Sequence, residues 1–567
     1  MEVYLRGDGT LKWWMIGISI MATQASAITF LSTPGQAIED GMRFIQFYFG
    51  LPLAMIIISA FFAPVYYKLN VLTAYEYLEQ RFDLKTRALT ALLFLLLRGL
   101  SAGITIFAPS LVLSTVLHWP VEAATLLIGT LVMIYSVSGG SKAVSLTQRL
   151  QLTIVMFGML LAGIIAYSML PENLGFLETV KIAGHLGKLN MINFLPADAA
   201  QHLPPGVPSV DQLTWAQKAD LVLKDRFNIW SGLIASVFLF LSYFGTDQSQ
   251  VGRYLGGKKN LAESRLGLMF NGLLKIPMQF IILFIGVLVF VFYLFHQPPV
   301  YHNQVLYERA LNTSTRAQFL LFEQQFDSLF RLKQQAVNGL VQAVESNNEV
   351  EINRKRQLVK SLELQEKQLR EDVKAEIARV FPNAKVQDRD YIFLNFVLNH
   401  LPHGVIGLLL AVMFLAAMSS VAGELSALAS TTSVDFYKRL VVKNASARHY
   451  LVASKSFSVL WTVLAVLFAI LASFAENLIQ FVNIVGSLFY GTILGVFITA
   501  FFIRYVQGTA VFVAAIAAEL IVLYCYRFTD IAFLLYNIIG CAAVVILGVT
   551  IQWIINVNEK AGQGRPS

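Results

Sequence analysis

The feature that most limits the fold of this chain is a series of about twelve long apolar segments. Of the 567 residues, 56% are hydrophobic and 14% are charged. The apolar residues gather into blocks of roughly 20 residues, the length of helix that crosses the hydrocarbon core of a bilayer. A chain of this pattern is an all-α membrane protein with about twelve transmembrane helices. The segments are 12–34, 43–66, 88–117, 120–138, 143–169, 228–252, 266–295, 404–433, 450–474, 478–503, 509–526 and 532–554.

Lysine and arginine are concentrated on one side of the predicted membrane. The short connections of the other side, near 35–42, 118–119, 475–477 and 528–531, contain neither residue. Because positive residues mark the cytoplasmic side, we expect a multi-pass protein of the cell inner (cytoplasmic) membrane with both termini inside. The net charge of +8 then reflects topology, and no nucleic-acid partner is expected. The cytoplasmic residues would be Lys68, Arg81, Lys85, Arg87, Lys142, Arg149, Arg253, Lys258, Lys259, Arg265, Lys438, Arg439, Lys443 and Arg448.

Two long polar segments interrupt the apolar series on the extracytoplasmic side. The first, 171–227, is predicted to be a loop over the helix bundle. The second, 297–391, contains helical spacing over 313–380 with a break at Ser346, Asn347 and Asn348, which predicts a helical hairpin. The hairpin is either a solvated spacer with an internal seam or an arm for a partner protein or self-association. The expected seam residues are Phe319, Phe322, Phe326, Phe330 and Leu332 on one helix, and Leu358, Leu362, Leu364 and Leu369 on the other.

The first and sixth apolar segments carry polar residues where a membrane helix could break. Thr23, Gln24, Ser26 and Thr29 lie among alanines in the first segment. In the sixth, Gly245, Asp247, Gln248 and Gln250 follow an apolar run. A broken helix frees backbone carbonyls that bind a cation or a substrate. A charged carboxylate within the membrane is energetically costly, so Asp247 should have a functional role or a charge partner. Breaks at corresponding positions of two five-helix halves are typical of inverted-repeat transporters.

The eighth segment contains two adjacent hydroxyls, Ser419 and Ser420, among alanines and glycine. Small neighbours allow a second backbone to approach, and hydroxyl oxygens can replace the water around a hard cation. This helix is therefore the predicted place for an ion.

Five motifs, in order along the chain, resemble those of the sodium:solute symporter family of the bacterial type. The motifs are WWMIGISIMATQASAITFLSTPG, LTAYEYLEQRFD, GGSKAVSLTQRLQ, FGTDQSQVGRYLGGK, and LPHGVIGLLLAVMFLAAMSS continued through VDFYKR. The resemblance implies an inverted five-plus-five helix fold, followed here by two extra C-terminal helices. It also implies transport by alternating access coupled to sodium.

The same resemblance implies a sodium site on the broken first helix and the eighth helix. Its ligands would be the carbonyl oxygens of Ala22, Ala25 and Ala416 and the hydroxyls of Ser419 and Ser420. Members that couple a second sodium ion usually have an aspartate and further hydroxyls at positions that here read Gln148, Ala422 and Gly423. We therefore predict one sodium ion per cycle. We further hypothesise that Glu424 meets Arg149 or another cation, so that a fixed charge replaces the lost ion.

The solute should bind midway between the two broken helices. Arg98, in the third segment, could attract a carboxylate or pair with Asp247. The sugar transporters that this chain resembles have an acidic and an amide residue where it has Ile28 and Thr29, which argues against a hexose of that type. The identity of the solute stays open. The candidate contacts are Ser26, Thr29, Gln46, Phe47, Asp247, Gln248, Ser487 and Tyr490.

Sodium-coupled uptake of a small organic solute is therefore the predicted function. The alternatives are a ligand-sensing receptor on a transporter fold and a symporter coupled to protons through Asp247 or Glu424. An enzyme is not expected, because no metal-ligand spacing, phosphate loop or nucleophile elbow is present. The expected organisation is a first repeat over 1–170, a loop over 171–227, a second repeat over 228–505 interrupted by 297–391, and two further helices with a short tail over 506–567. The expected partners are the solute and membrane lipid.

Overall fold

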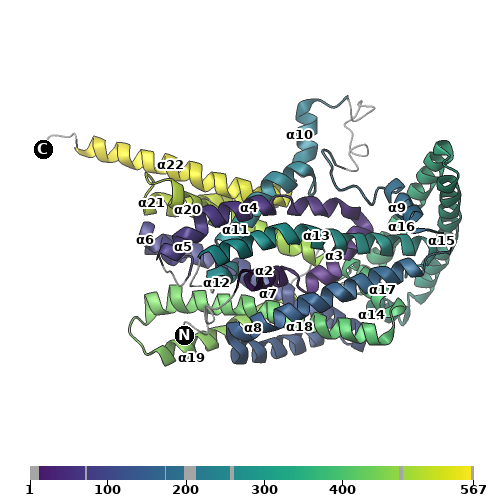
Figure 1. The fold of residues 1–567 in the computed structure, drawn as a ribbon, viewed down its shortest axis with the longest axis horizontal. Helices are drawn as coiled ribbons and strands as arrows, with labels where there is room; N and C mark the ends of the chain where they lie inside the picture. The colour runs from purple at the N-terminus through teal and green to yellow at the C-terminus, as the bar shows by residue number, and fades with distance from the viewer. Residues whose placement is uncertain are drawn as a thin grey trace.

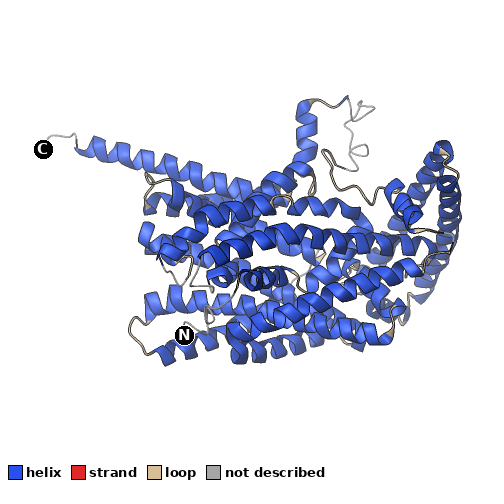
Figure 2. Ribbon diagram, in the orientation of Figure 1, coloured by secondary structure: helices blue, strands red, loops and turns tan. Residues whose placement is uncertain are grey.

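The computed structural model of the chain describes residues 12–69, 73–172, 174–196, 212–255, 261–382, 384–471 and 477–563. The side chains of 138–149 and 560–563 lie outside this description. Within the described ranges the structure is built from helices, and none of these residues lies in a strand (Figure 2). The predicted all-α class is therefore confirmed.

Nine stretches of the described residues are long and apolar enough to cross a membrane. Two shorter apolar helices, Val121–Val137 and Ser231–Gly245, add to them. Each of the predicted apolar segments coincides with helix, and Ala27–Leu69 joins parts of the first two. The other eight stretches are Leu84–Leu117, Leu150–Ser168, Leu261–Phe295, His403–Val441, Ala447–Leu471, Leu478–Phe502, Gly508–Phe528 and Phe533–Glu559.

The helices form one elongated bundle with the insertion at one end (Figure 1). The first half contains α2 (Trp13–Gln24), α3 (Ala27–Asp40), η1 (Gly41–Tyr48), α4 (Leu51–Ile57), η2 (Ile58–Phe62), α5 (Ala63–Leu69), α6 (Glu76–Arg81), α7 (Leu84–Leu117), α8 (Val121–Ser168) and α9 (Phe176–His185). Next come α10 (Trp215–Lys224), η5 (Ser231–Ala235), α11 (Ser236–Gly245), α12 (Gln248–Leu255), α13 (Leu261–Phe295), α14 (Gln304–Leu311), α15 (Arg316–Glu345), α16 (Glu349–Val380), η6 (Arg389–Tyr391) and α17 (Ile392–His400). The last are α18 (His403–Thr431), η7 (Thr432–Val441), α19 (Ala447–Leu471), α20 (Leu478–Phe502), α21 (Gly508–Phe528), η8 (Phe533–Leu535) and α22 (Tyr536–Gln563).

Helical backbone geometry also covers the connection expected between the fourth and fifth segments, so α8 includes both of them. Its two apolar sections, Val121–Val137 and Leu150–Ser168, are the described parts of the two predicted spans. The side chains of Lys142, Gln148 and Arg149 fall outside the described residues.

The two predicted breaks are confirmed. Helix α2 ends at Gln24, Ala25 and Ser26 leave helical geometry with ψ angles of 59° and 179°, and α3 begins at Ala27. Helix α11 ends at Gly245 and α12 begins at Gln248. Asp247 caps α12, because its Oδ1 accepts the backbone N–H of Ser249 at 2.8 Å. The carboxylate therefore stabilises the break beside it.

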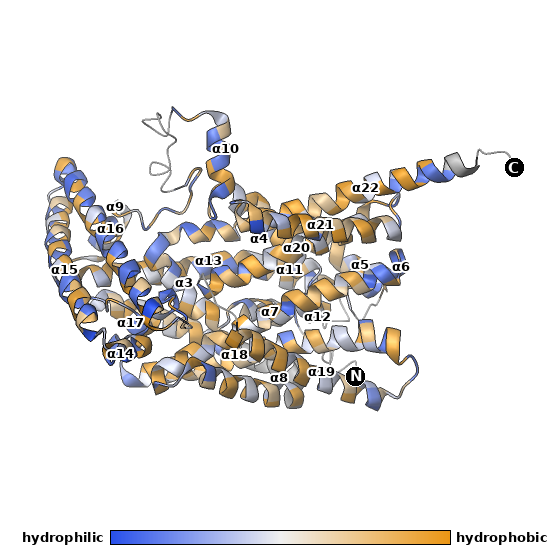
Figure 3. Ribbon diagram, turned by 180° about the vertical axis from the view of Figure 1, so that it is seen from behind, coloured by the Kyte–Doolittle hydropathy of each residue, from blue (hydrophilic) through white to orange (hydrophobic). Residues whose placement is uncertain are grey.

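The insertion forms the predicted hairpin of α15 and α16 at one end of the bundle, while α6, α12 and the end of α22 lie toward the other (Figure 1). Its helices are visibly more hydrophilic than those of the bundle (Figure 3). Asn347 has a φ angle of 50° in the turn, and the side chain of Asn348 caps α16. The predicted phenylalanines are buried, but Leu332, Leu358 and Leu364 are exposed, so their assignment to the seam was wrong. Ile352, Val359, Val373 and Ile377 fill the seam instead, because they lie on the face of α16 that turns inward.

Candidate functional site

The break between α2 and α3 exposes backbone oxygens to the interior of the bundle. Ala22 and Ala25 are 6% and 7% exposed. Among the described residues, no backbone N–H is hydrogen-bonded to the carbonyl oxygen of either alanine, because the chain leaves helical geometry there. Buried carbonyl oxygens that accept no backbone hydrogen bond can coordinate a cation.

Helix α18 packs against α2, α3 and α8 and carries the serine pair. The Ser419 hydroxyl has two acceptors within reach of its single proton, the Oε1 atom of Gln151 at 2.7 Å and the carbonyl oxygen of Ala416 at 3.1 Å. Ser420 is 2% exposed, and its Oγ has no hydrogen-bond partner among the described residues. A buried hydroxyl without a partner costs about 1–3 kcal/mol, which a bound ion would offset. The residues expected at the sodium site therefore fit a monovalent cation.

Gln151 is a residue of this region that was not proposed as a site residue. It lies on α8, is 3% exposed, and its Nε2 donates to the carbonyl oxygen of Leu415 at 3.1 Å. The only signal in the sequence was its place at the end of the third motif. The amide fixes the orientation of Ser419 by bonding to α18 at two points.

Arg98 of α7 is the centre of a buried charge network. It forms ion pairs with Asp247 and with Glu424, the latter at 3.2 Å. Its Nη2 also donates to the Tyr490 hydroxyl at 2.7 Å, and that hydroxyl donates to Asp247 at 2.9 Å. The guanidinium lies over the ring of Tyr243 at 5.4 Å. Arg98 is thus the cation that meets Glu424, whereas the side chain of Arg149 lies outside the described residues.

A cavity of about 120 Å³ lies beside this network. Of the predicted solute contacts, Ser26, Thr29, Phe47 and Tyr490 line it. Gln24, Arg98, Ser420, Glu424 and Asn483 also line it and were not predicted as solute contacts. Polar residues from α2, α7, α18 and α20 therefore meet at one small cavity, an arrangement that only the packing of these helices produces.

The other four predicted contacts do not line this cavity. Asp247 lies next to it through Arg98. Gln46 bonds to the carbonyl oxygen of Phe227, and the Gln248 side chain accepts the N–H of Ala74. The Ser487 hydroxyl accepts from Asn537. These three side chains join helices to their neighbours.

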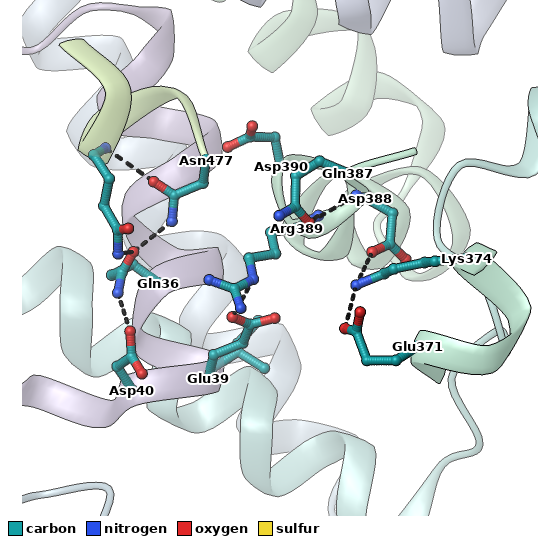
Figure 4. Close-up of polar contacts among 12 residues, drawn as sticks. Gln36, Glu39, Asp40, Glu371, Lys374, Gln387, Asp388, Arg389, Asp390 and Asn477 are labelled. Atoms are coloured by element: carbon teal, nitrogen blue, oxygen red, sulfur yellow. Dashed lines mark hydrogen bonds and ion pairs between the residues drawn. The ribbon is translucent and has the colours of Figure 1, made fainter. Parts of the chain in front are cut away.

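A second polar network holds the end of α3 near the insertion (Figure 4). Gln36 accepts hydrogen bonds from Asn477 and Gln480 at the start of α20. Glu39 pairs with Arg389 at 2.7 Å. The network ties α3, the second half of the broken first helix, to α20 and to the segment that follows α16.

Two aspartates that flank Arg389 belong to the same network and have opposite pKa shifts. Asp388 pairs with Lys374 of α16 at 3.2 Å. Burial acts to raise the pKa of Asp388, but His302 and Lys374 outweigh it and the pKa lies below its ordinary value. Asp390 accepts the N–H of Leu478 at 3.2 Å, and burial raises its pKa to about 6.

We expect Asp390→Asn to stabilise the protein at pH 7.5 and Asp388→Asn to destabilise it. The carboxyl of Asp390 has a higher pKa in the folded state than in the unfolded state. Its contribution to the free energy of unfolding is therefore complete below the unfolded pKa and is lost as the pH rises through about 6. The gain from Asp390→Asn should therefore grow from about pH 4 to pH 6, to roughly 3 kcal/mol, and stay level above pH 6. The lowered pKa of Asp388 gives stability present above its unfolded value and lost as pH falls further, so the penalty of Asp388→Asn should be constant at neutral pH and shrink only below about pH 4. Thermal unfolding of the purified variants from about pH 3 to pH 7.5 measures both, and equal pH profiles would contradict the assignment.

The broken helices, the cavity between them and the apolar bundle define a helical membrane transporter of the broken-helix kind. A family model for the sodium:solute symporter family matches residues 4–298 and 374–517. Because the match covers most of the chain, the chain belongs to the sodium:solute symporter family, as its motifs predicted. The residues between the two matched parts, 299–373, contain α14, α15 and most of α16.

Individual relatives are more distant. The chain is 26% identical to the human sodium/iodide cotransporter over 297 residues, which are 52% of this chain and 41% of that protein. It is 23% identical to the sodium/sialic acid symporter NanT of Aliivibrio fischeri over 552 residues, covering 96% of this chain and 86% of that protein. The match thus spans about two fifths of the length of the first relative and most of the second.

A solved structure has the same fold. It is the substrate-bound, outward-open state of a Na⁺-coupled sialic acid symporter, with a TM-score of 0.70 and 22% identity over 98% of this chain and 92% of that one. The predicted symporter fold and the multi-pass membrane class are therefore confirmed.

Proposed function

We propose that this chain is a sodium-coupled secondary active symporter that imports a small organic solute by alternating access, with one sodium ion per cycle. The observation that carries the proposal is the buried Ser420 hydroxyl beside a helix break: within the described part of the chain, neither this hydroxyl nor the carbonyl oxygens of Ala22 and Ala25 have a hydrogen-bond partner. Sodium would be held by the carbonyl oxygens of Ala22, Ala25 and Ala416 and by Ser419 and Ser420.

The residues that follow the serine pair support a stoichiometry of one sodium ion per cycle. Ala422 and Gly423 carry no hydroxyl, and Glu424 of the next turn is already paired with the fixed cation Arg98. A second sodium ion at this place would have fewer oxygen ligands and would compete with Arg98 for the carboxylate. In this scheme, sodium joins the broken first helix to α18, and solute binding beside it completes the closed state.

The end of the bundle that carries α6 and α12 is proposed to face the cytoplasm, with the hairpin outside. Arginine and lysine residues predicted on the cytoplasmic side belong to these elements, and the hairpin lies toward the other end (Figure 1). Both termini would then be cytoplasmic. The division into two repeats, 1–170 and 228–505, belongs to the same proposal.

Sodium dependence is tested with the purified full-length protein in sodium chloride or potassium chloride at equal ionic strength. Sodium alone should raise the melting temperature, because an ion that binds only the folded state adds roughly 2.7 kcal/mol at 100 times its Kd. Radioactive sodium binding gives the stoichiometry, with a value near one expected. Equal stabilisation by potassium would contradict sodium coupling. Solute uptake driven by a pH gradient without sodium would favour protons, and solute binding without uptake would favour a receptor.

A further inference from the structure

The cavity contains hydrogen-bond acceptors that the protein itself does not use. The Oε1 atom of Gln24 and the Oε2 atom of Glu424 are buried, and neither has a partner among the described residues. Both residues line the cavity together with Ser420. Buried oxygens without donors carry a desolvation cost that a ligand with N–H, O–H or cationic groups would remove.

The charge network is balanced, and Arg98 is already occupied. Arg98 and Arg253, which interacts electrostatically with both carboxylates, contribute two positive charges, and Asp247 and Glu424 contribute two negative charges when ionised. The Nη1 and Nη2 atoms of Arg98 are already bonded to these residues and to Tyr490. These bonds use three of the five N–H groups of Arg98, including both of Nη2, and its buried Nε has no partner among the described residues. A two-point contact with a carboxylate needs a free N–H on Nη2, so Arg98 cannot offer the geometry of a free arginine.

Aromatic rings supply the remaining wall of the cavity. Phe47 and Tyr48 of η1, Phe240 and Tyr243 of α11, and Tyr490 of α20 line it. The rings of Phe47 and Phe240 are 5.2 Å apart, and those of Tyr243 and Tyr490 are 5.9 Å apart. Aromatic faces beside a carboxylate attract alkylammonium groups, because the ring quadrupole and the carboxylate act in the same direction.

We propose that the transported solute carries an alkylammonium group, which lies against the aromatic rings and is bound by Glu424 and the amide oxygen of Gln24. This inference rests on the proposed function and narrows the solute to cationic or zwitterionic amines. The small size of the cavity, about 120 Å³, favours a compact ammonium group over a bulky one. A simple carboxylate such as pyruvate would meet the carboxylate of Glu424 and an occupied arginine.

The test compares choline with 3,3-dimethylbutan-1-ol, which has the same shape without the charge. Thermal stability of the full-length protein in sodium chloride is measured against each compound, tetramethylammonium, glycine betaine and pyruvate. Choline and tetramethylammonium should stabilise the protein, and the neutral alcohol should bind at least tenfold more weakly. Glu424→Gln should remove this preference. Glu519→Gln is the matched control, because Glu519 is also a carboxylate with 8% exposure but does not line the cavity, and it should keep the preference.

The outcomes separate this inference from the proposed function. If sodium stabilises the wild-type protein but choline and tetramethylammonium do not, or pyruvate or the alcohol does so equally well, the ammonium inference fails and sodium coupling stands. If sodium itself has no specific effect, the proposed function fails. Should Glu424→Gln not fold, Gln24→Leu provides a second variant, which should weaken choline binding at least fivefold and leave the pyruvate response unchanged.

Discussion

Replacing Ser420 by alanine should raise the sodium concentration for half-maximal stabilisation by roughly 10-fold to 100-fold. The hydroxyl is one of five proposed ligands, and a bond from a neutral group to an ion contributes about 1.5–3 kcal/mol. Without sodium, the variant should be as stable as the wild type or slightly more so, because it no longer buries a hydroxyl that lacks a partner. Thermal unfolding in a sodium titration measures both effects, and sodium-driven uptake should fall in parallel.

Ser454→Ala is the control for this substitution. Ser454 lies on α19, is 1% exposed, and its Oγ has no partner among the described residues. The substitution therefore removes the same hydroxyl from a similarly buried side chain, but Ser454 lies on a helix that contributes none of the proposed ligands. Its sodium titration should match the wild type. A shift of equal size in both variants would show that loss of a buried hydroxyl, and not loss of an ion ligand, causes the change.

Replacing Arg98 by glutamine should be the most destabilising single substitution in the charge network. The change leaves Asp247 and Glu424 buried without their cation, and removal of one partner from a buried ion pair costs roughly 3–5 kcal/mol. Uptake should be lost, because Arg98 and Glu424 also line the cavity. The measurement is thermal unfolding of the variant beside the wild type in sodium chloride.

Double variants decide whether the penalty comes from charge. Arg98→Gln combined with Asp247→Asn should recover part of the lost stability, since one unpaired carboxylate is removed. Arg439→Gln is the comparison at the surface, where Arg439 pairs with Glu79 and is 46% exposed, so its substitution should cost little stability. If Arg98→Gln cost no more than Arg439→Gln, the network would have no role in stability.

The sequence alone was sufficient for the helical membrane class and for both helix breaks. Apolar segments of membrane length leave few choices, because every backbone group must find a hydrogen bond within its own helix. The polar residues between Thr23 and Thr29 and between Gly245 and Gln250 indicate the places where backbone groups can be satisfied by other polar groups, so that the helix can break. Both breaks are local features, so local sequence was enough to find them.

The cavity could be predicted only in part. Ser26, Thr29, Phe47 and Tyr490 line it, but Gln46, Gln248 and Ser487 bond to neighbouring helices instead. A polar side chain inside a bundle can point to a cavity or to an adjacent helix, and the choice depends on helix rotation. Exposed Leu332, Leu358 and Leu364 of the hairpin were assigned wrongly for the same reason.

The sequence by itself determined which segments are helical, where two of them break and which helix carries the serine pair. Only the tertiary structure decided that Arg98 joins Asp247 to Glu424, that Ser420 and Gln24 face one cavity, and that Gln151 orients Ser419. These contacts join residues from 149 to 326 positions apart along the chain. Apolarity and backbone hydrogen bonding act within a segment, whereas the pairing of buried charges depends on how separate helices pack, and no local pattern records that packing.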